Sequence, residues 1–427
     1  MSGTRRQALR APSRLWPFKA RDDFVTVVDL GAQKVACAIV SFAAPRFGLD
    51  AGARNIRVLG CATVRSSGFS AGRISNVTAA ETSVRRAVAQ AEAQAGVTAG
   101  DVIVTGQFEG LGAQIFEAKP GGGRAFMLKE DAAAIAAAVE EQCLSLRRQL
   151  LHMFTIASDG NEMQNLGGMG APLAEEVDVA ALSMPMKGYQ QIVSCFRRSM
   201  LTVRSLVAGP VATALAVTDS LERTAGVLAV DMGAECTGYA LFTQGVPVAA
   251  GCIGSGGQDI TDRIARTFAL RKFEAERTKI RYGGAFDGLQ ADADLPVESG
   301  GGEPISKFAL NHHIRSNASH VFRAINERLK DAGYSIPTGG AVLAGGGSLL
   351  PGMRELASYL LACEVRTAAP IVLNGLSGGN ALAALVGACL YASRHQSAGE
   401  MRYAPGIVSQ DSSYASRISQ WLRASFL

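Results

Sequence analysis

Two stretches of similar sequence carry the residues best suited to bind a phosphorylated ligand. The first reads Val-Val-Asp-Leu-Gly-Ala over 27–32, and the second reads Ala-Val-Asp-Met-Gly-Ala over 229–234. In each, an apolar run precedes Asp-x-Gly-Ala, and a second run of small and apolar residues follows. Glycine permits a tight turn and the runs are too short for helices, so each stretch predicts a strand, a turn and a strand. Because the same arrangement occurs twice, it indicates two halves of one repeated architecture.

The chemistry of these turns suits a nucleotide. Backbone N–H groups at such turns bind phosphate oxygens, and the carboxylates of Asp29 and Asp231 can hold magnesium through water. A third stretch, Gly-Gly-Gly-Ser over 345–348, follows a buried-strand pattern and lets a flat ligand lie against the backbone. A single Asp-x-Gly turn is usually only structural. Two of them followed by this loop predict a nucleotide pocket between two lobes.

This order of motifs resembles the actin, hexokinase and heat-shock chaperone ATPase superfold. The resemblance implies an α/β fold with two lobes around a nucleotide cleft, and it implies ATP and Mg²⁺ as cofactors. The two hairpins are similar to the first and second phosphate loops of that superfold, and 345–348 is similar to its adenosine loop. The implied metal residues are Asp29 and Asp231, acting through water. The implied nucleotide-binding residues are Asp29, Gly31, Gln33, Lys34, Asp231, Gly233, Thr237, Gly256, Gly257, Glu276, Lys279, Gly345, Gly346, Gly347 and Ser348.

Four of these residues lie in segments with a plainer alternative. Gly256 and Gly257 precede a capped helix, which suits phosphate approach at a helix N-terminus but also fits an ordinary turn and cap. Glu276 and Lys279 share one helix face. The carboxylate can accept from ribose hydroxyls while the lysine stem packs on adenine, but the pair also fits a surface ion pair. Their place between the second turn and the glycine-rich loop favours the nucleotide interpretation.

Composition narrows the function classes. The chain has 48% hydrophobic and 19% charged residues, a balance typical of a globular protein. Its net charge of +5 is too small to argue for nucleic acid as a partner. The eight cysteines show no C-x-x-C spacing, which favours free thiols in a reducing cytosol. No apolar run reaches the ~20 residues that span a bilayer, so any membrane contact is expected to be peripheral.

The C-terminal segment has the pattern of an amphipathic helix. At 100° per residue its large apolar side chains fall within about 140° of one another, with arginines flanking that arc. Such a helix suits a membrane surface with acidic lipids, and the alternative is a helix that docks back on the protein. The predicted membrane-binding residues are Tyr414, Arg417, Ile418, Trp421, Leu422, Arg423 and Phe426.

Over nearly its whole length the chain resembles the bacterial cell-division family FtsA, down to a terminal helix containing Trp-Leu-Arg. The resemblance implies an actin-like protein that polymerises at the inner face of the cytoplasmic membrane at the division site. It implies that the protein binds acidic membrane lipids, tethers FtsZ and recruits other division proteins. The FtsZ contact is expected within 258–335.

The expected organisation follows from these motifs. The segments are a basic arm (1–23), the first lobe core (24–105 and 186–222), an inserted FtsA-type subdomain (106–185), the second lobe core (223–257 and 336–393), a second-lobe subdomain (258–335), a linker (394–412) and the terminal helix (413–427). Residues 128–151 are predicted to form one long helix, and 379–392 to close the second lobe.

Some residues depart from the family pattern. Ala32 and Gln33 stand where the first loop usually has Thr or Ser, and 234–236 reads Ala-Glu-Cys in place of glycine-rich sequence. Glu235 would repel phosphates if it faced inward. No Gln, Glu or Asp that could activate water lies between 205 and 215, so we expect loose ATP binding or slow hydrolysis. The protein is then mainly a scaffold and at most a slow ATPase. The alternatives are a small-molecule kinase or phosphatase of the same superfold, and a related actin-like scaffold of pilus assembly.

Overall fold

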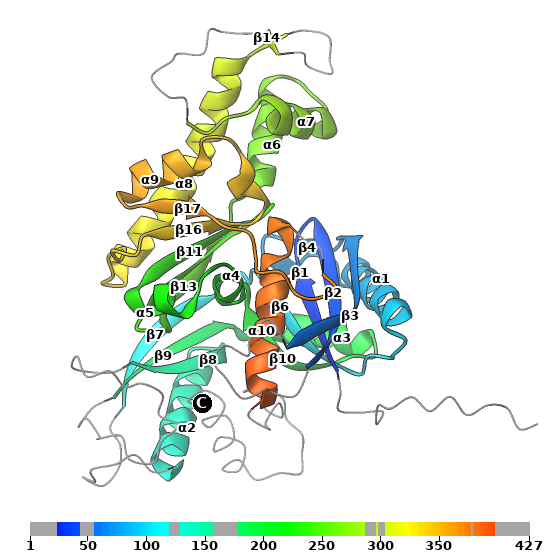
Figure 1. Cartoon of the computed structure of the whole chain (residues 1–427), viewed down its shortest axis with the longest axis vertical. Helices are drawn as coiled ribbons and strands as arrows, with labels where there is room; N and C mark the ends of the chain where they lie inside the picture. The colour runs from blue at the N-terminus through cyan, green and yellow to red at the C-terminus, as the bar shows by residue number, and fades with distance from the viewer. Residues whose placement is uncertain are drawn as a thin grey trace, which may run out of the picture.

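The computed structural model describes residues 24–42, 55–118, 129–156, 177–286, 296–297, 304–376 and 379–397. These residues form two lobes, each built on a β-sheet with helices against it (Figure 1). The predicted basic arm, most of the predicted linker and the predicted terminal helix lie outside the described residues. Within the described part of the chain, no helix is long and apolar enough to cross a membrane.

The first lobe contains a five-stranded sheet in the order β10-β6-β1-β2-β3. Strand β2 runs antiparallel to both of its neighbours, β1 and β3, whereas β6 and β10 run parallel to β1. A short hairpin, β4–β5, follows β3. The strands are β1 (Val25–Leu30), β2 (Lys34–Phe42), β3 (Ile56–Arg65), β4 (Phe69–Ser70), β5 (Arg73–Ile74), β6 (Asp101–Gly106) and β10 (Thr202–Ala208).

The second lobe contains an eight-stranded sheet in the order β17-β16-β11-β12-β13-β7-β9-β8. Its first five strands have the same order and relative directions as the first-lobe sheet. The predicted repeat of one architecture is therefore confirmed. The strands are β7 (Gly112–Ala118), β8 (Arg148–Ile156), β9 (Val177–Pro185), β11 (Val227–Met232), β12 (Thr237–Thr243), β13 (Val246–Ile253), β16 (Ala341–Ala344) and β17 (Val365–Thr367); β14 (Pro296–Val297) and β15 (Ile305–Ser306) form a separate pair.

The helices cover these sheets. They are α1 (Val77–Ala95), α2 (Lys129–Ser145), α3 (Met186–Arg198), α4 (Gly209–Val217), α5 (Ser220–Ala225), α6 (Gly257–Thr267), α7 (Lys272–Tyr282), α8 (Lys307–Asp331), α9 (Met353–Leu361) and α10 (Ala383–Ser397), with 3₁₀ turns η1 (Gly346–Leu349) and η2 (Asn380–Leu382). Helix α1 starts at an Asn76 cap and ends at Gly96 in the left-handed conformation, which accounts for its sharp limits. Helices α6, α7 and α8 project from the second lobe away from the first (Figure 1).

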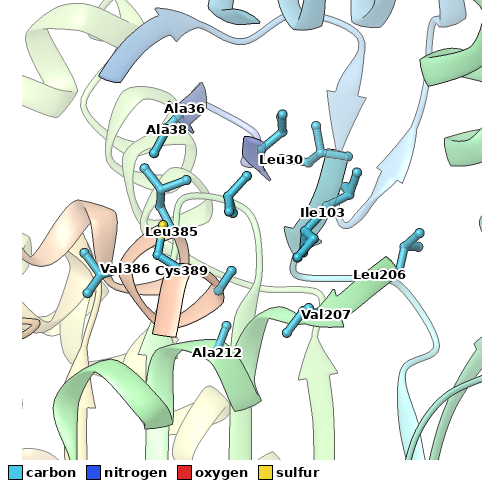
Figure 2. Packing of buried hydrophobic residues seen from close by; sticks show 14 of the residues in the cluster. Leu30, Ala36, Ala38, Ile103, Leu206, Val207, Ala212, Leu385, Val386 and Cys389 are labelled. Atoms are coloured by element: carbon cyan, nitrogen blue, oxygen red, sulfur yellow. The ribbon is translucent and has the colours of Figure 1, made fainter. Parts of the chain in front are cut away.

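Two apolar helices, α4 and α10, lie between the two sheets (Figure 1). Helix α10 packs on α4 and on strands β1, β2 and β6 of the first lobe. Figure 2 shows Leu385, Val386 and Cys389 of α10 beside first-lobe core residues such as Ala38. The prediction that 379–392 closes the second lobe is therefore wrong. Helix α10 is apolar over most of its surface, so its sequence carries no sign of which sheet it covers.

Strands β7, β9 and β8 extend the second-lobe sheet, joined to it through one residue pair, Gly251 with Gly112. Helix α2 packs on β8, and its own small core includes Val139 and Met153. The prediction of one helix over 128–151 is wrong at its C-terminal end. The helix stops at Ser145, and Arg147 adopts a φ of 57° that turns the chain into β8.

Candidate nucleotide-binding site

The two Asp-x-Gly turns have the same backbone geometry. In the first hairpin Asp29 pairs with Ala36, and in the second Asp231 pairs with Gly238, so each aspartate lies seven residues before its partner. The glycine of each turn donates its N–H to the carbonyl three residues later, at an N···O distance of 3.0 Å in both lobes. An added Cβ would come within 2.8 Å of that carbonyl in the first turn and 2.7 Å in the second, so both positions need glycine.

Asp29 is a buried carboxylate at the end of β1. Burial raises its pKa to about 7, opposed by the positive charge of Lys34 and reinforced by the negative charge of Asp231. The Lys34 ammonium donates to the carbonyl of Ala381, just ahead of α10. Burial lowers the pKa of Lys34, while Asp29 and Asp231 raise it. The two predicted metal-binding carboxylates and the predicted lysine therefore lie close enough for their charges to shift one another's pKa.

Asp231 is held by two neutral donors from the first lobe side of the cleft. Its Oδ2 atom accepts from Gln107 Nε2 at 2.8 Å and from Thr213 Oγ1 at 2.7 Å. Burial raises the pKa of Asp231, whereas these two hydrogen bonds and the charge of Lys34 lower it. The hydrogen bonds fix the carboxylate in one orientation without neutralising it.

The Glu235 side chain reaches across the cleft to the first lobe. Its Oε2 atom accepts from the backbone N–H of Ala71, at the tip of the β4–β5 hairpin, at 2.8 Å. From the sequence, this carboxylate was expected to repel phosphates if it faced inward. In the structure its contact with the hairpin joins the two lobes.

The N-terminus of α6 is occupied by the second turn. Gly257 donates its N–H to the Gly233 carbonyl at 3.0 Å, and Gln258 donates to the Ala234 carbonyl at 2.6 Å. The Gly256 N–H donates to Asp259 Oδ2 at 2.8 Å. The predicted glycines thus lie beside the second turn, and their N–H groups are engaged by protein acceptors.

Glu276 and Lys279 of α7 lie beside the start of α6. Lys279, 5% exposed, donates to Glu276 Oε2, to the Gly257 carbonyl and to Thr261 Oγ1, each at 2.8 Å. Thr261 also donates to Glu276. The pair is therefore no surface ion pair, because it fastens α7 to the segment that contacts the second turn.

The glycine-rich loop lies directly over the second hairpin. Gly345 has a φ of 79°, and an added Cβ there would come within 2.5 Å of Asp231 Oδ1. A Cβ at Gly347 would come within 2.9 Å of the Met232 Cβ, whereas one at Gly346 would meet nothing within 4 Å. Ser348 turns inward and donates to the Gly345 carbonyl at 2.8 Å. Gly346 is thus the position where the loop leaves open space.

The two remaining predicted residues have structural contacts. Thr237 is fully buried and donates to the Ser255 carbonyl at 2.8 Å. Gln33 has an exposed side chain, and its carbonyl accepts from the Ser66 N–H. Within the described part of the chain, neither side chain has a hydrogen bond to Asp29 or Asp231.

One cavity touches both turns. It is bounded by Gly31 and Ala32 of the first turn, by residues 233–236 of the second and by Gln107, and its far wall is the β4–β5 hairpin. The glycine-rich loop and the α7 pair lie outside its lining. The cavity therefore adjoins the phosphate side of the predicted site.

Sequence analysis missed two residues, Gln107 and Thr213. Gln107 follows the carboxyl end of parallel strand β6, where ligands of α/β proteins bind. Thr213 is the one polar residue in the nine-residue helix α4. The position of Gln107 after an apolar run and the isolated polar residue Thr213 in an apolar segment are both visible in the sequence.

The residues fit a magnesium nucleotide in most respects. The first lobe supplies the buried carboxylate of Asp29 and the second the half-buried carboxylate of Asp231, Lys34 adds a cation, and Gly346 leaves room beside the backbone. Among the described residues, no cluster of three or more His, Cys, Asp or Glu side chains could hold a metal directly. Magnesium that keeps several of its waters needs only one or two carboxylates. The engaged N-terminus of α6 does not fit, and the side chains of Thr237 and Lys279 are also held by protein acceptors.

Two lobes with one repeated strand order, joined at paired Asp-Gly turns, define the actin-like ATPase fold. Among solved structures, the PilM-PilN type IV pilus biogenesis complex matches with a TM-score of 0.62 and 16% identity, covering 86% of this chain and 98% of that one. At this identity the match shows the fold alone.

Sequence comparison gives the family. The family model described as "Cell division protein FtsA" matches residues 228–387. Cell division protein FtsA of Rhizobium meliloti (strain 1021) is 30% identical over 438 residues, covering 97% of each chain. Its counterpart in Pseudomonas aeruginosa is 27% identical, covering 93% of this chain and 97% of that protein. The chain belongs to the FtsA family of cell division proteins.

Proposed function

We propose that this chain is an ATP-binding scaffold of the division machinery. It polymerises on the inner face of the cytoplasmic membrane, tethers FtsZ filaments there and helps to recruit septum-building proteins. The observation that carries the nucleotide part is the identical geometry of the two turns, with Asp29 and Asp231 on opposite sides of one cleft.

In this proposal the protein's own groups bind and orient the nucleotide. The backbone of both turns and Lys34 receive the phosphates, Gly346 receives the adenosine, and Asp29 and Asp231 hold magnesium through water. Magnesium, when bound, offsets the phosphate charge. The cost of bringing phosphates near the buried Asp29 and the half-buried Asp231 carboxylates supports slow turnover and a mainly structural role.

Titration with a fluorescent ATP analogue tests the nucleotide site. We expect saturable, magnesium-dependent binding by the full-length chain, and at least a tenfold loss of affinity in Gly346→Val, which fills the open space over the loop. Gly100→Val is the control, because an added Cβ there also meets nothing within 4 Å, and Gly100 precedes β6 at the end of that strand away from the turns. Equal binding by all three proteins, or none, would remove the ATP part of the proposal.

The membrane part rests on the sequence pattern of 413–427. A single short helix binds weakly, so attachment is expected to need many copies on one polymer. Co-pelleting with acidic liposomes, with and without ATP, compares full-length protein with residues 1–410. Trp421→Glu places a charge in the apolar arc, whereas Gln420→Glu places the same charge opposite it. We expect only wild type and Gln420→Glu to pellet. Equal pelleting of the truncated chain would show that the tail is no anchor.

The FtsZ part is supported by the surface of α7. Phe273 and Ile280 lie two turns apart on one helix face and are 59% and 64% exposed. Arg277 lies between them on that face, and the Arg271 guanidinium lies 4.6 Å from the Phe273 ring centroid. Exposed apolar side chains among arginines suit an acidic segment that also carries apolar residues.

Binding of purified FtsZ tests this surface. Ile280→Glu should weaken FtsZ binding at least tenfold, because it removes the apolar contact and adds a repelling charge. Leu221→Glu on α5 also replaces an exposed aliphatic side chain with glutamate, at a leucine that is 79% exposed, and this variant should bind normally. If both variants bind as wild type does, the contact lies elsewhere.

A further inference from the structure

The repeat within the fold assigns a place to Gln107. In the second lobe Asp231 pairs with Ala344, so the glycine-rich loop starts at Gly345. In the first lobe the equivalent Asp29 pairs with Thr105. Gly106 therefore corresponds to Gly345, and Gln107 corresponds to Gly346. The first-lobe counterpart of the open position in the glycine-rich loop thus carries a glutamine.

The Gln107 side chain crosses to the other lobe. Its Nε2 donates to Asp231 Oδ2 at 2.8 Å, and it also lines the cavity that touches both turns. Glycines make room for it: a Cβ at Gly238 would come within 1.9 Å of Gln107 Oε1, and a Cβ at Gly209 within 3.2 Å of its backbone nitrogen.

One atom of the amide has no partner. Gln107 Oε1 is buried, and no described residue donates a hydrogen bond to it. A buried acceptor without a donor is costly, and water is the donor that a polar cavity supplies. Nε2 is committed to a carboxylate, so the amide is oriented with Oε1 as its free acceptor.

We propose that Gln107 is a positioning residue of the nucleotide site, holding the Asp231 carboxylate through Nε2 and a water molecule through Oε1. This inference rests on the proposed nucleotide function. It supplies, from the end of β6, the amide that the segment 205–215 lacks. In hydrolysis the water oxygen bonds to the γ-phosphorus and the bond from that phosphorus to the bridging oxygen breaks. ADP leaves with the electron pair, and the water's protons leave with the phosphate.

The test separates binding from turnover in the full-length protein with Mg²⁺. Affinities for fluorescent ADP and ATP analogues and the rate of phosphate release in a single turnover are measured for wild type, Gln107→Ala and Gln107→Glu. Gln90→Ala on the exposed face of α1 is the control and should match wild type. We expect Gln107→Ala to bind ADP within about threefold of wild type and to release phosphate at least tenfold more slowly.

Gln107→Glu adds a readout that a purely structural role would not give. A carboxyl in this place faces Asp231, Asp29 and Lys34, and it can donate to Asp231 only when protonated. Measured relative to wild type at the same pH, the ADP affinity and phosphate release of Gln107→Glu should therefore recover as pH falls. Unchanged phosphate release in Gln107→Ala, equal losses of binding and turnover, or a wild-type protein that binds ATP without hydrolysing it would each overturn the inference. A wild-type protein that binds no nucleotide would instead overturn the proposed function.

Discussion

The carboxylate of Glu235 in the second lobe accepts a hydrogen bond from the backbone N–H of Ala71 in the first, at 2.8 Å. Ala71 has a φ of 48°, a left-handed conformation that costs about 1 kcal/mol for alanine. The hairpin tip is thus held in a strained shape that aims its N–H at the second turn. This contact joins the two walls of the cavity beside the turns.

Removing the Glu235 acceptor should loosen the hairpin. A hydrogen bond to a charged group contributes roughly 1.5–3 kcal/mol, and the partial exposure of Glu235 places this one at the low end. In Glu235→Ala we expect amide hydrogen exchange over 69–74 to rise about tenfold, which corresponds to about 1.4 kcal/mol. Glu109→Ala removes an exposed ion pair with Arg73 of the same hairpin and should leave exchange unchanged. Equal effects of the two substitutions would contradict a specific role for Glu235.

The raised pKa of Asp29 predicts a pH dependence of stability. Its ordinary value is 3.8 and its value in the folded chain is about 7. Between these values the unfolded chain releases the proton and the folded chain keeps it, so the contribution of Asp29 is present at low pH and is lost as pH rises to 7. Asp29→Asn stays neutral throughout. Its free energy of unfolding should therefore increasingly exceed that of wild type from pH 5 to pH 7, by at most about 1.4 kcal/mol per pH unit.

Urea denaturation at pH 5, 6, 7 and 8 measures this difference. Asp101→Asn, at an exposed aspartate paired with Arg204, serves as the control. Parallel pH profiles for wild type and Asp29→Asn would show that the Asp29 carboxyl is not a proton-binding group of the folded protein.

The contacts of Lys279 predict that the protein's stability depends on the attachment of α7 to the segment beside the second turn. Lys279→Met keeps much of the side-chain volume but leaves Glu276, Thr261 and the Gly257 carbonyl without their shared donor. Breaking a buried ion pair costs about 3–5 kcal/mol, and because Glu276 is one-third exposed we expect about 2 kcal/mol. Lys272→Met removes an exposed lysine that pairs with Asp262, and it should cost less than about 0.5 kcal/mol. A loss of stability no larger than that of Lys272→Met would show that the cluster does not fasten α7.

The sequence was informative where a local rule decides the structure. Both hairpins follow from short apolar runs that meet at glycines whose turns admit no side chain. The limits of α1 follow from Asn76 and Gly96 in the same way. The C-terminal end of α2 was misplaced because alanine-rich sequence continues to favour a helix, whereas Arg147 in the left-handed conformation is set by packing.

Contacts between distant segments could not be predicted in this way. Nothing near Glu235 in the sequence indicates Ala71, and nothing near Lys34 indicates the Ala381 carbonyl. The sequence places Gln107 directly after an apolar run, but its correspondence to Gly346 became visible only in the strand pairing. The internal repeat is visible in the sequence as two motifs, but its register needs the sheets.

The sequence assigned α10 to the second lobe, whereas in the structure α10 packs on α4 and on strands of the first lobe. A single substitution tests this packing. A Cβ at Gly387 would come within 1.6 Å of the Ala212 carbonyl oxygen, so α10 and α4 approach backbone to backbone. Alanine normally favours a helix over glycine by about 1 kcal/mol, but here Gly387→Ala must push the two helices apart and should destabilise the protein by about 2–3 kcal/mol. Gly379→Ala is the matched control, because a Cβ there meets nothing within 4 Å. The urea denaturation midpoints of the two variants are compared with that of wild type, and only Gly387→Ala should have a lower midpoint. A Gly387→Ala protein more stable than wild type would mean that α10 does not pack on α4, because only that contact makes the added methyl group unfavourable.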